Sequence, residues 1–211
     1  MKKIFFAIAF IMLSINVMAQ RYLECALNAG FGFTDGVDRR LTGCFGFSGG
    51  LTIENGLGLG VFFSGFQTTR KEDSRMADNF DDCEFCFRGY YGGVYGEHIF
   101  LRKSFFYVDA GARFGMGGVN YSNHTVDNEY FDPTDGSYDV TYEKADKHFV
   151  MSLEPYGNIN FDFNDHFTLA AGVKYRNLFF TKLNCGGYHI CGSGDLNGMV
   201  FLLRAKFRIE I

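Results

Sequence analysis

Apolar side chains recur at every second position along most of this chain, and this alternation sharply narrows the folds open to it. Eight runs show the pattern, at about 21–33, 42–53, 57–68, 85–101, 108–117, 148–163, 167–176 and 197–211. Successive side chains of a β-strand point to opposite faces, whereas a helix gives a period near 3.6. The pattern therefore predicts an all-β chain whose strands each have one apolar and one polar face.

The runs are long, and the connections between them alternate in length. Most runs reach the ~9–11 residues that a tilted membrane-spanning strand needs. Short connections fall at 54–56, 102–104 and 164–166, where Asn, Asp, Gly and Ser favour tight turns. Long connections fall at about 34–41, 69–84, 121–147 and 184–195. An even number of strands with short turns at one end and long loops at the other predicts an eight-stranded antiparallel up-and-down transmembrane β-barrel.

The alternation alone does not say which face points inward, so a soluble lipocalin-like barrel with an apolar interior is the alternative. The 211 residues include 27 Gly and 26 Phe. Phe lies mostly on the apolar face, while Gly lies mainly on the polar face beside sparse charges. A water-facing surface would instead favour Lys, Glu, Ser and Thr, and a narrow lumen needs small residues beside large polar ones. We therefore expect the apolar face to meet lipid.

The first 19 residues have the layout of a cleavable secretory signal. Two lysines precede an uncharged apolar stretch, and Val17-Met18-Ala19 supplies the small residue that signal peptidase requires. The stretch is short for a retained membrane helix, which is the alternative. We expect cleavage between Ala19 and Gln20, with residues 1–19 as the signal peptide and residues 20–211 as the barrel.

Across essentially all of residues 20–211, the chain resembles the small eight-stranded outer-membrane barrels of the OmpX and OmpA transmembrane-domain type. The signal ending at Ala19, the alternating strands and the C-terminal segment 201–211 carry the resemblance. That segment looks like the terminal strand signal read by the barrel-assembly machinery. The resemblance implies a Gram-negative outer-membrane location, with extracellular loops, periplasmic termini, and contact with membrane lipid and lipopolysaccharide.

The polar faces bring charged side chains into the predicted lumen. Buried charges are costly unless they are paired, so we expect one connected network. A turn at Asn164-Asp165 sets Glu154 opposite Arg176 with both side chains inward, and barrel closure brings Glu24 near Lys206 or Arg208. We interpret the network as a plug that fixes the barrel, with a polar gate or proton path as the alternative. Its predicted members are Glu24, Arg88, Asp109, Arg113, Glu154, Lys174, Arg176, Arg204, Lys206, Arg208 and Glu210.

Six cysteines in an exported chain favour disulfides. Cys25 and Cys44 lie on strands with opposite predicted facings, so we do not expect them to pair. A bond within each loop or between loops stays open, as do free thiols and a zinc site that would include His189. We expect no metal. The candidate disulfide cysteines flank two long loops and are Cys83, Cys86, Cys185 and Cys191.

The loop at 121–147 is acidic and contains several aromatic residues. It lacks the spacing of a calcium-binding loop, and its tyrosines suit a surface contact. None of the five histidines has a serine at a recognisable catalytic spacing, so we expect no catalytic residue, no cofactor and no enzyme. A net charge of −4 gives no support for a nucleic-acid partner.

These features predict an integral outer-membrane barrel with a side-chain-filled lumen. Its expected role is structural, or surface binding and adhesion through the extracellular loops to a ligand that the sequence does not identify. The alternatives are a conduit for small hydrophobic or ionic solutes, and a lipid-modifying barrel enzyme.

Overall fold

The computed structural model describes residues 21–36, 39–53, 56–69, 71–72, 83–103, 105–131, 138–141, 148–185 and 188–211. The predicted signal peptide and its cleavage site before Gln20 lie outside these residues. Within them, no helix is long and apolar enough to cross a membrane.

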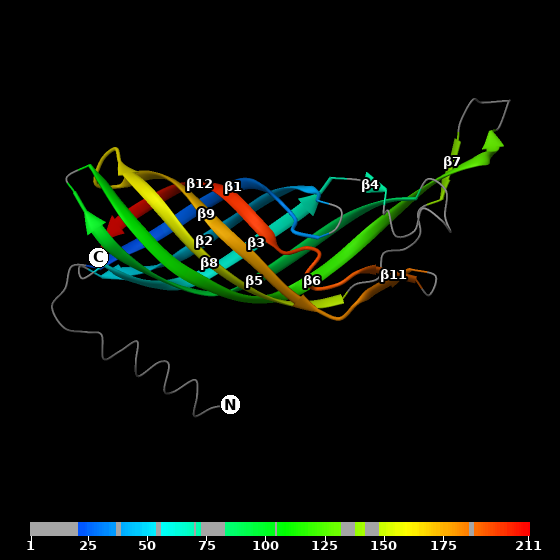
Figure 1. The fold of residues 1–211 in the computed structure, drawn as a ribbon. Coiled ribbons are helices and arrows are strands. Elements are labelled where there is room, and N and C mark those ends of the chain that lie inside the picture. The colour runs from blue at the N-terminus through cyan, green and yellow to red at the C-terminus, as the bar shows by residue number, and fades with distance from the viewer. Residues whose placement is uncertain are drawn as a thin grey trace.

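Within the described residues, eight long antiparallel strands close into a barrel (Figure 1). Each pairs with the next long strand along the chain, and β1 pairs with β12 to complete the ring. Closure pairs the strands on both sides, so no long strand keeps an open edge. The predicted fold class is confirmed. The barrel strands are β1 (Arg21–Phe33), β2 (Leu41–Ile53), β3 (Leu57–Thr68), β5 (Cys83–Arg102), β6 (Phe106–Phe131), β8 (His148–Asp162), β9 (Phe167–Phe180) and β12 (Gly198–Glu210).

Within the described residues, four short strands lie in the ranges predicted as long loops or at their edge. They are β4 (Lys71–Glu72), β7 (Tyr138–Thr141), β10 (Leu183–Cys185) and β11 (Tyr188–Cys191). β4 pairs with β5 and β7 pairs with β6, while β10 and β11 form a hairpin. The 20 residues of β5 and 26 of β6 exceed what a membrane span requires. This side of the barrel therefore extends well past its neighbours at the long-loop end (Figure 1), and the loop predicted to begin at 121 begins as strand.

The short turns form where the sequence predicts them. Gly56 has a φ of +85° in the turn between β2 and β3, a conformation that favours glycine. Between β8 and β9, the side-chain oxygen of Asn164 accepts hydrogen bonds from the backbone N–H groups of His166 and Phe167, at 2.9 and 2.8 Å. These local contacts reverse the chain without a long loop.

The period of two appears directly in the burial of the strands. Along β2, exposed and buried residues alternate from Leu41 to Ser48. The one reversed prediction falls on β5, where Tyr91 and Tyr95 are buried and Arg88 is exposed. The prediction that Arg88 faces the lumen is therefore wrong. A tyrosine ring suits an apolar face, but here the hydroxyl of Tyr91 donates to Glu154 and both rings fill the interior.

The outer wall of the barrel is apolar on every long strand. Leu203 is 69% exposed, Val61 63% and Phe149 63%, and none of the described residues packs over these side chains. A continuous apolar band around a closed barrel is the surface that hydrocarbon requires. The outward face of the fold is therefore a lipid-facing surface.

Candidate functional site

A charged network fills the lumen near the short-turn end of the barrel, and Lys206 is at its centre. The ammonium nitrogen of Lys206 lies 2.9 Å from Asp109, 3.5 Å from Glu24 and 3.7 Å from Glu97. Arg204 is 3.5 Å from Glu97. All these side chains are almost fully buried. The network therefore ties β1, β5, β6 and β12 together across the interior.

Neutral side chains also donate hydrogen bonds to two of these buried carboxylates. The amide nitrogens of Asn158 and Asn160 donate to the two carboxylate oxygens of Asp109, at 2.6 and 2.8 Å. The hydroxyl of Tyr156 donates to Glu97 at 2.8 Å. Because Asp109 and Glu97 are hydrogen-bonded as well as ion-paired, the cost of burying these two carboxylates is reduced.

Arg208 continues the network to the rim. Its guanidinium lies 3.5 Å from Glu24 and 3.4 Å from Asp162, and it donates a hydrogen bond to the hydroxyl of Tyr107. Glu24 therefore lies close to both Lys206 and Arg208, the two partners that barrel closure was expected to bring near it. Glu210 is exposed, outside the network.

A second cluster surrounds Glu154 at mid-barrel. The carboxylate accepts hydrogen bonds from Lys174 at 2.8 Å and from the hydroxyl of Tyr91 at 2.5 Å. The expected partner, Arg176, instead donates to the carbonyl of Leu196 at 3.1 and 2.9 Å. The β8–β9 register is constant from Val150↔Phe180 to Asp162↔Thr168, so it sets Glu154 opposite Arg176 as predicted, with both side chains buried. The ion pair, however, is made by Lys174, two residues along β9.

Arg113 is buried among aromatic rings in the same layer. Its guanidinium carbon lies 5.4 Å from the ring centre of Phe62 and 5.0 Å from that of Tyr156. Arg176 lies 4.3 Å from the ring centre of Phe66. Such cation–π contacts stabilise a cation where water is excluded. Cation–π contacts also occur near the short-turn end, where Lys206 and Arg208 lie over the ring of Tyr107, so they accompany the ion pairs along the lumen.

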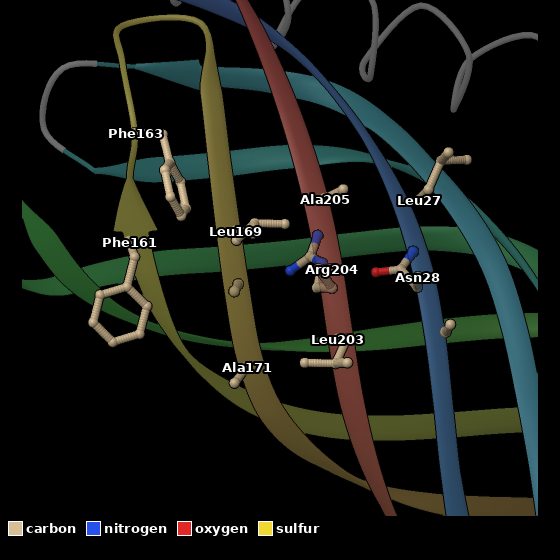
Figure 2. A pocket seen from close by; sticks show the side chains of 11 residues that line it. Leu27, Asn28, Phe161, Phe163, Leu169, Ala171, Leu203, Arg204 and Ala205 are labelled. Carbon is tan, nitrogen blue, oxygen red and sulfur yellow. The ribbon is translucent and has the colours of Figure 1, made fainter.

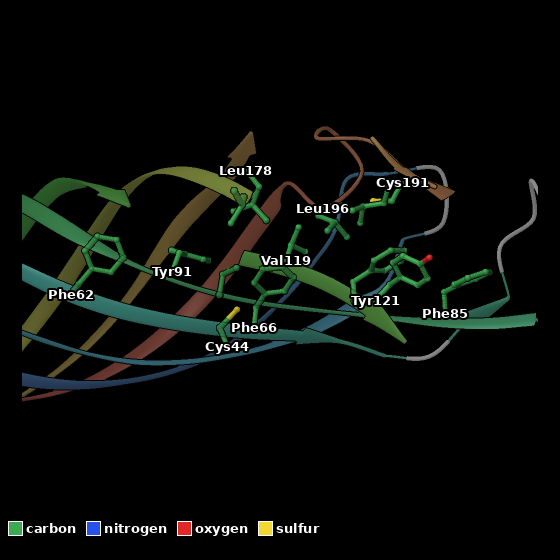
Figure 3. Close-up of a cluster of buried hydrophobic side chains, with 14 of the residues drawn as sticks. Cys44, Phe62, Phe66, Phe85, Tyr91, Val119, Tyr121, Leu178, Cys191 and Leu196 are labelled. Atoms are coloured by element: carbon green, nitrogen blue, oxygen red, sulfur yellow. The ribbon is translucent and has the colours of Figure 1, made fainter. Parts of the chain in front are cut away.

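An apolar cluster closes the lumen beyond these arginines (Figure 3). Phe66, Val119, Leu178 and Leu196 are each at most 1% exposed and point into the barrel. The cluster continues to Phe85 near the far end of the extended wall. These buried side chains form an apolar seal in the long-loop half of the lumen.

The segment between β1 and β2 is fastened to this seal. Arg40 donates to the carbonyl of Phe85 at 2.5 Å and lies 5.2 Å from the ring centre of Phe87. The amide of Asp35 donates to the carbonyl of Asn197 at 2.7 Å, and its carboxylate accepts from Tyr175 at 2.5 Å. Sequence reasoning placed Arg40 in a loop and missed its role, because an inward arginine beyond the strand leaves no periodic signal.

The cysteines form no disulfide among the described side chains. Cys86 is a free, buried thiol that donates to the carbonyl of Thr68 at 3.2 Å, so the structure does not contain the candidate bond between Cys83 and Cys86. The thiol of Cys191 is buried, 3.5 Å from the carbonyl of Gly192. The side chains of Cys83 and Cys185 are not described, and neither are those of residues 123–147 in the acidic loop.

No protein-family model matches the chain, and neither does any curated protein. Several solved structures do. Neisserial surface protein A is 14% identical over 90% of this chain and 97% of its own, with a TM-score of 0.47. Ail, the attachment invasion locus protein of Yersinia pestis, is 17% identical over 91% of this chain and 100% of its own, with a TM-score of 0.42. Both are eight-stranded outer-membrane barrels, the type that the sequence resembles. At these identities the likeness concerns the fold alone.

Proposed function

We propose that the protein is an integral outer-membrane barrel with a sealed lumen, which serves as a rigid support for a surface that binds an extracellular ligand. One observation carries the proposal. The described lumen is filled by the charged network in its short-turn half and by the apolar cluster in its long-loop half. A conduit for small solutes would require the side chains of both layers to move apart and open a path. A rigid support, in contrast, is stabilised by both layers.

The proposed orientation follows from the asymmetry of the two ends. The long connections and the extension of β5 and β6 lie at one end, and both chain termini of the barrel lie at the other. In the proposal, the extended end is extracellular and the termini are periplasmic. The apolar outer wall contacts membrane lipid and lipopolysaccharide, and β12 is the strand that the barrel-assembly machinery recognises.

The binding surface in this proposal is the extended end, formed by β4, β5, β6 and β7. A surface held by strand pairing loses less conformational entropy on binding than a free loop would. The hydrogen bonds of Arg40 and Asp35 brace the same end from inside the barrel. The proposal assigns no catalytic residue to the chain.

Adhesion of whole cells tests the proposal. Cells that express the full chain are compared, on immobilised matrix proteins and glycans, with cells expressing a variant whose residues 132–137 are replaced by Gly-Ser-Gly. We expect the wild type to adhere to at least one surface and the variant to adhere less. A His98→Ala variant, changed at an exposed position near the opposite end, is the control. Adhesion equal to that of cells without the protein would refute the proposal, and so would stepwise conductance of the wild type in planar bilayers.

A further inference from the structure

The lipid-facing wall contains a groove of about 540 Å³ that crosses β8, β9, β12 and β1 (Figure 2). Its outward-facing lining is wholly apolar. The floor of the groove consists of Ala29, Ala171 and Ala205. Its sides include Leu203, Leu169 and Phe163. The volume falls within the range of about 300–1,000 Å³ that is typical of small-molecule sites.

The strand register produces this depression. In one row across the wall, Ala205 lies between Leu27 and Leu169. In the next row, Leu203 lies between Ala29 and Ala171. Small and large side chains therefore alternate both along and across the strands. As a result, β1, β12 and β9 each contribute one alanine, over which the outer surface is depressed.

A polar hollow of about 520 Å³ adjoins the groove at the short-turn rim. Phe163 lines both, so the apolar groove and the polar hollow are neighbours at the turn between β8 and β9. The hollow is lined by side chains of both charges: Arg102, Lys103 and Arg208 are cationic, and Asp162, Asp165 and Glu210 are anionic.

Some of the charged side chains around the hollow are ion-paired with each other and some are not. Arg208 is paired with Asp162 at 3.4 Å. Among the described residues, Arg102, Lys103, Asp165 and Glu210 make no ion pair. Two cations and two anions around one hollow suit a ligand that itself bears both charges.

We propose that the groove and the hollow together bind one zwitterionic aminophospholipid. An acyl chain fills the groove over the three alanines. The phosphate lies near Arg102 and Lys103, and the ammonium lies near Asp165 and Glu210. The inference goes beyond ligand binding at the extended end and depends only on insertion of the barrel in a membrane. An anionic phospholipid would satisfy the cations but leave the two carboxylates facing its negative charge.

Lipid retention tests the groove. The full chain is inserted into vesicles of equal parts phosphatidylethanolamine and phosphatidylglycerol, extracted in mild detergent, and analysed by native mass spectrometry. We expect one phosphatidylethanolamine to be retained. Ala171→Phe with Ala205→Phe fills the groove and should lower retention about tenfold, and Ala29→Phe is an independent second variant. Ala112→Phe, an exposed alanine on β6 outside the groove, is the matched control and should retain the lipid.

Charge variants test the hollow. Arg102→Gln with Lys103→Gln should weaken retention of both lipids, whereas Asp165→Asn with Glu210→Gln should remove the preference for phosphatidylethanolamine. Equal retention of the two lipids by the wild type would overturn the proposal. So would groove-filling variants that retain lipid like Ala112→Phe, or a dimer that these variants abolish. A chain that never enters vesicles, seen by the loss of its heat-dependent gel shift, would contradict the membrane barrel itself.

Discussion

Lys206 and Asp109 lie on strands that are not neighbours in the barrel, β12 and β6, yet Nζ and Oδ2 are 2.9 Å apart across the lumen. The same ammonium faces Glu24 and Glu97. One buried cation therefore holds three carboxylates that would otherwise repel one another. It also joins walls of the barrel that no backbone hydrogen bond connects.

Replacing Lys206 with Met should destabilise the barrel strongly. The variant leaves three buried carboxylates short of a cation, and breaking one side of a buried ion pair costs about 3–5 kcal/mol. Equilibrium urea unfolding in lipid vesicles measures the change. Lys182→Met, at an exposed position after β9, is the control and should unfold like the wild type. If both variants had the same midpoint, the network would not contribute to stability.

Tyr91→Phe isolates one hydrogen bond at mid-barrel. It removes the hydroxyl that donates to Glu154 at 2.5 Å but keeps the ring. Hydrogen bonds to charged groups contribute about 1.5–3 kcal/mol, and the remaining bond to Lys174 favours the lower end. The neighbouring Tyr90→Phe removes a hydroxyl on the lipid side and should have little effect. Unfolding midpoints that fall equally in both variants would contradict this assignment.

The glycines of the lumen should be intolerant of even a methyl group. A Cβ at Gly50 would lie 2.6 Å from the hydroxyl of Tyr95 and 2.8 Å from the Cα of Gly60, so neither the ring nor the backbone has room. Overpacking of this kind costs about 1–3 kcal/mol. Gly43→Ala is the control, because a Cβ there meets nothing within 4 Å. We expect Gly50→Ala alone to lower the unfolding midpoint. A Gly50→Ala variant as stable as Gly43→Ala would show that the lumen has space to spare.

The sequence predicts the barrel well because lipid and lumen impose opposite demands on alternate residues. It fails where one residue type meets both demands. Tyrosine is apolar enough to be counted outward, yet Tyr91 and Tyr95 point inward. Glu97 shares their parity and is buried in the network, whereas Arg88 has the opposite parity. The carboxylate of Glu97 was the feature of the sequence that indicated which face of this strand points into the lumen.

The partner of Glu154 and the apolar seal were harder to predict. Lys174 and Arg176 both point inward on β9, two residues apart. The strand register sets Glu154 opposite Arg176, but Arg176 donates to the carbonyl of Leu196 and Lys174 reaches the carboxylate, which the register alone does not predict. The seal consists of apolar residues on the inward parity, such as Val200 and Leu202, which alternate with outward apolar neighbours. Where both parities are apolar, the period of two no longer distinguishes the faces.

Single tryptophans would test this assignment of faces directly, because the natural chain contains none. Tyr90→Trp and Val94→Trp replace residues that are 48% and 58% exposed on the outer wall of β5. Phe66→Trp places the indole inside the lumen, where Phe66 is 1% exposed. In vesicles of phospholipid brominated on its acyl chains, we expect the fluorescence of the two outward tryptophans to be strongly quenched and that of the inward one to be spared. Arg88 has the same parity as Tyr90 and Val94, so quenching of both would also place its backbone position on the outer face. If the outward tryptophans were instead shielded from the brominated chains, β5 would have the opposite facing, and Tyr91 could not be the donor to Glu154.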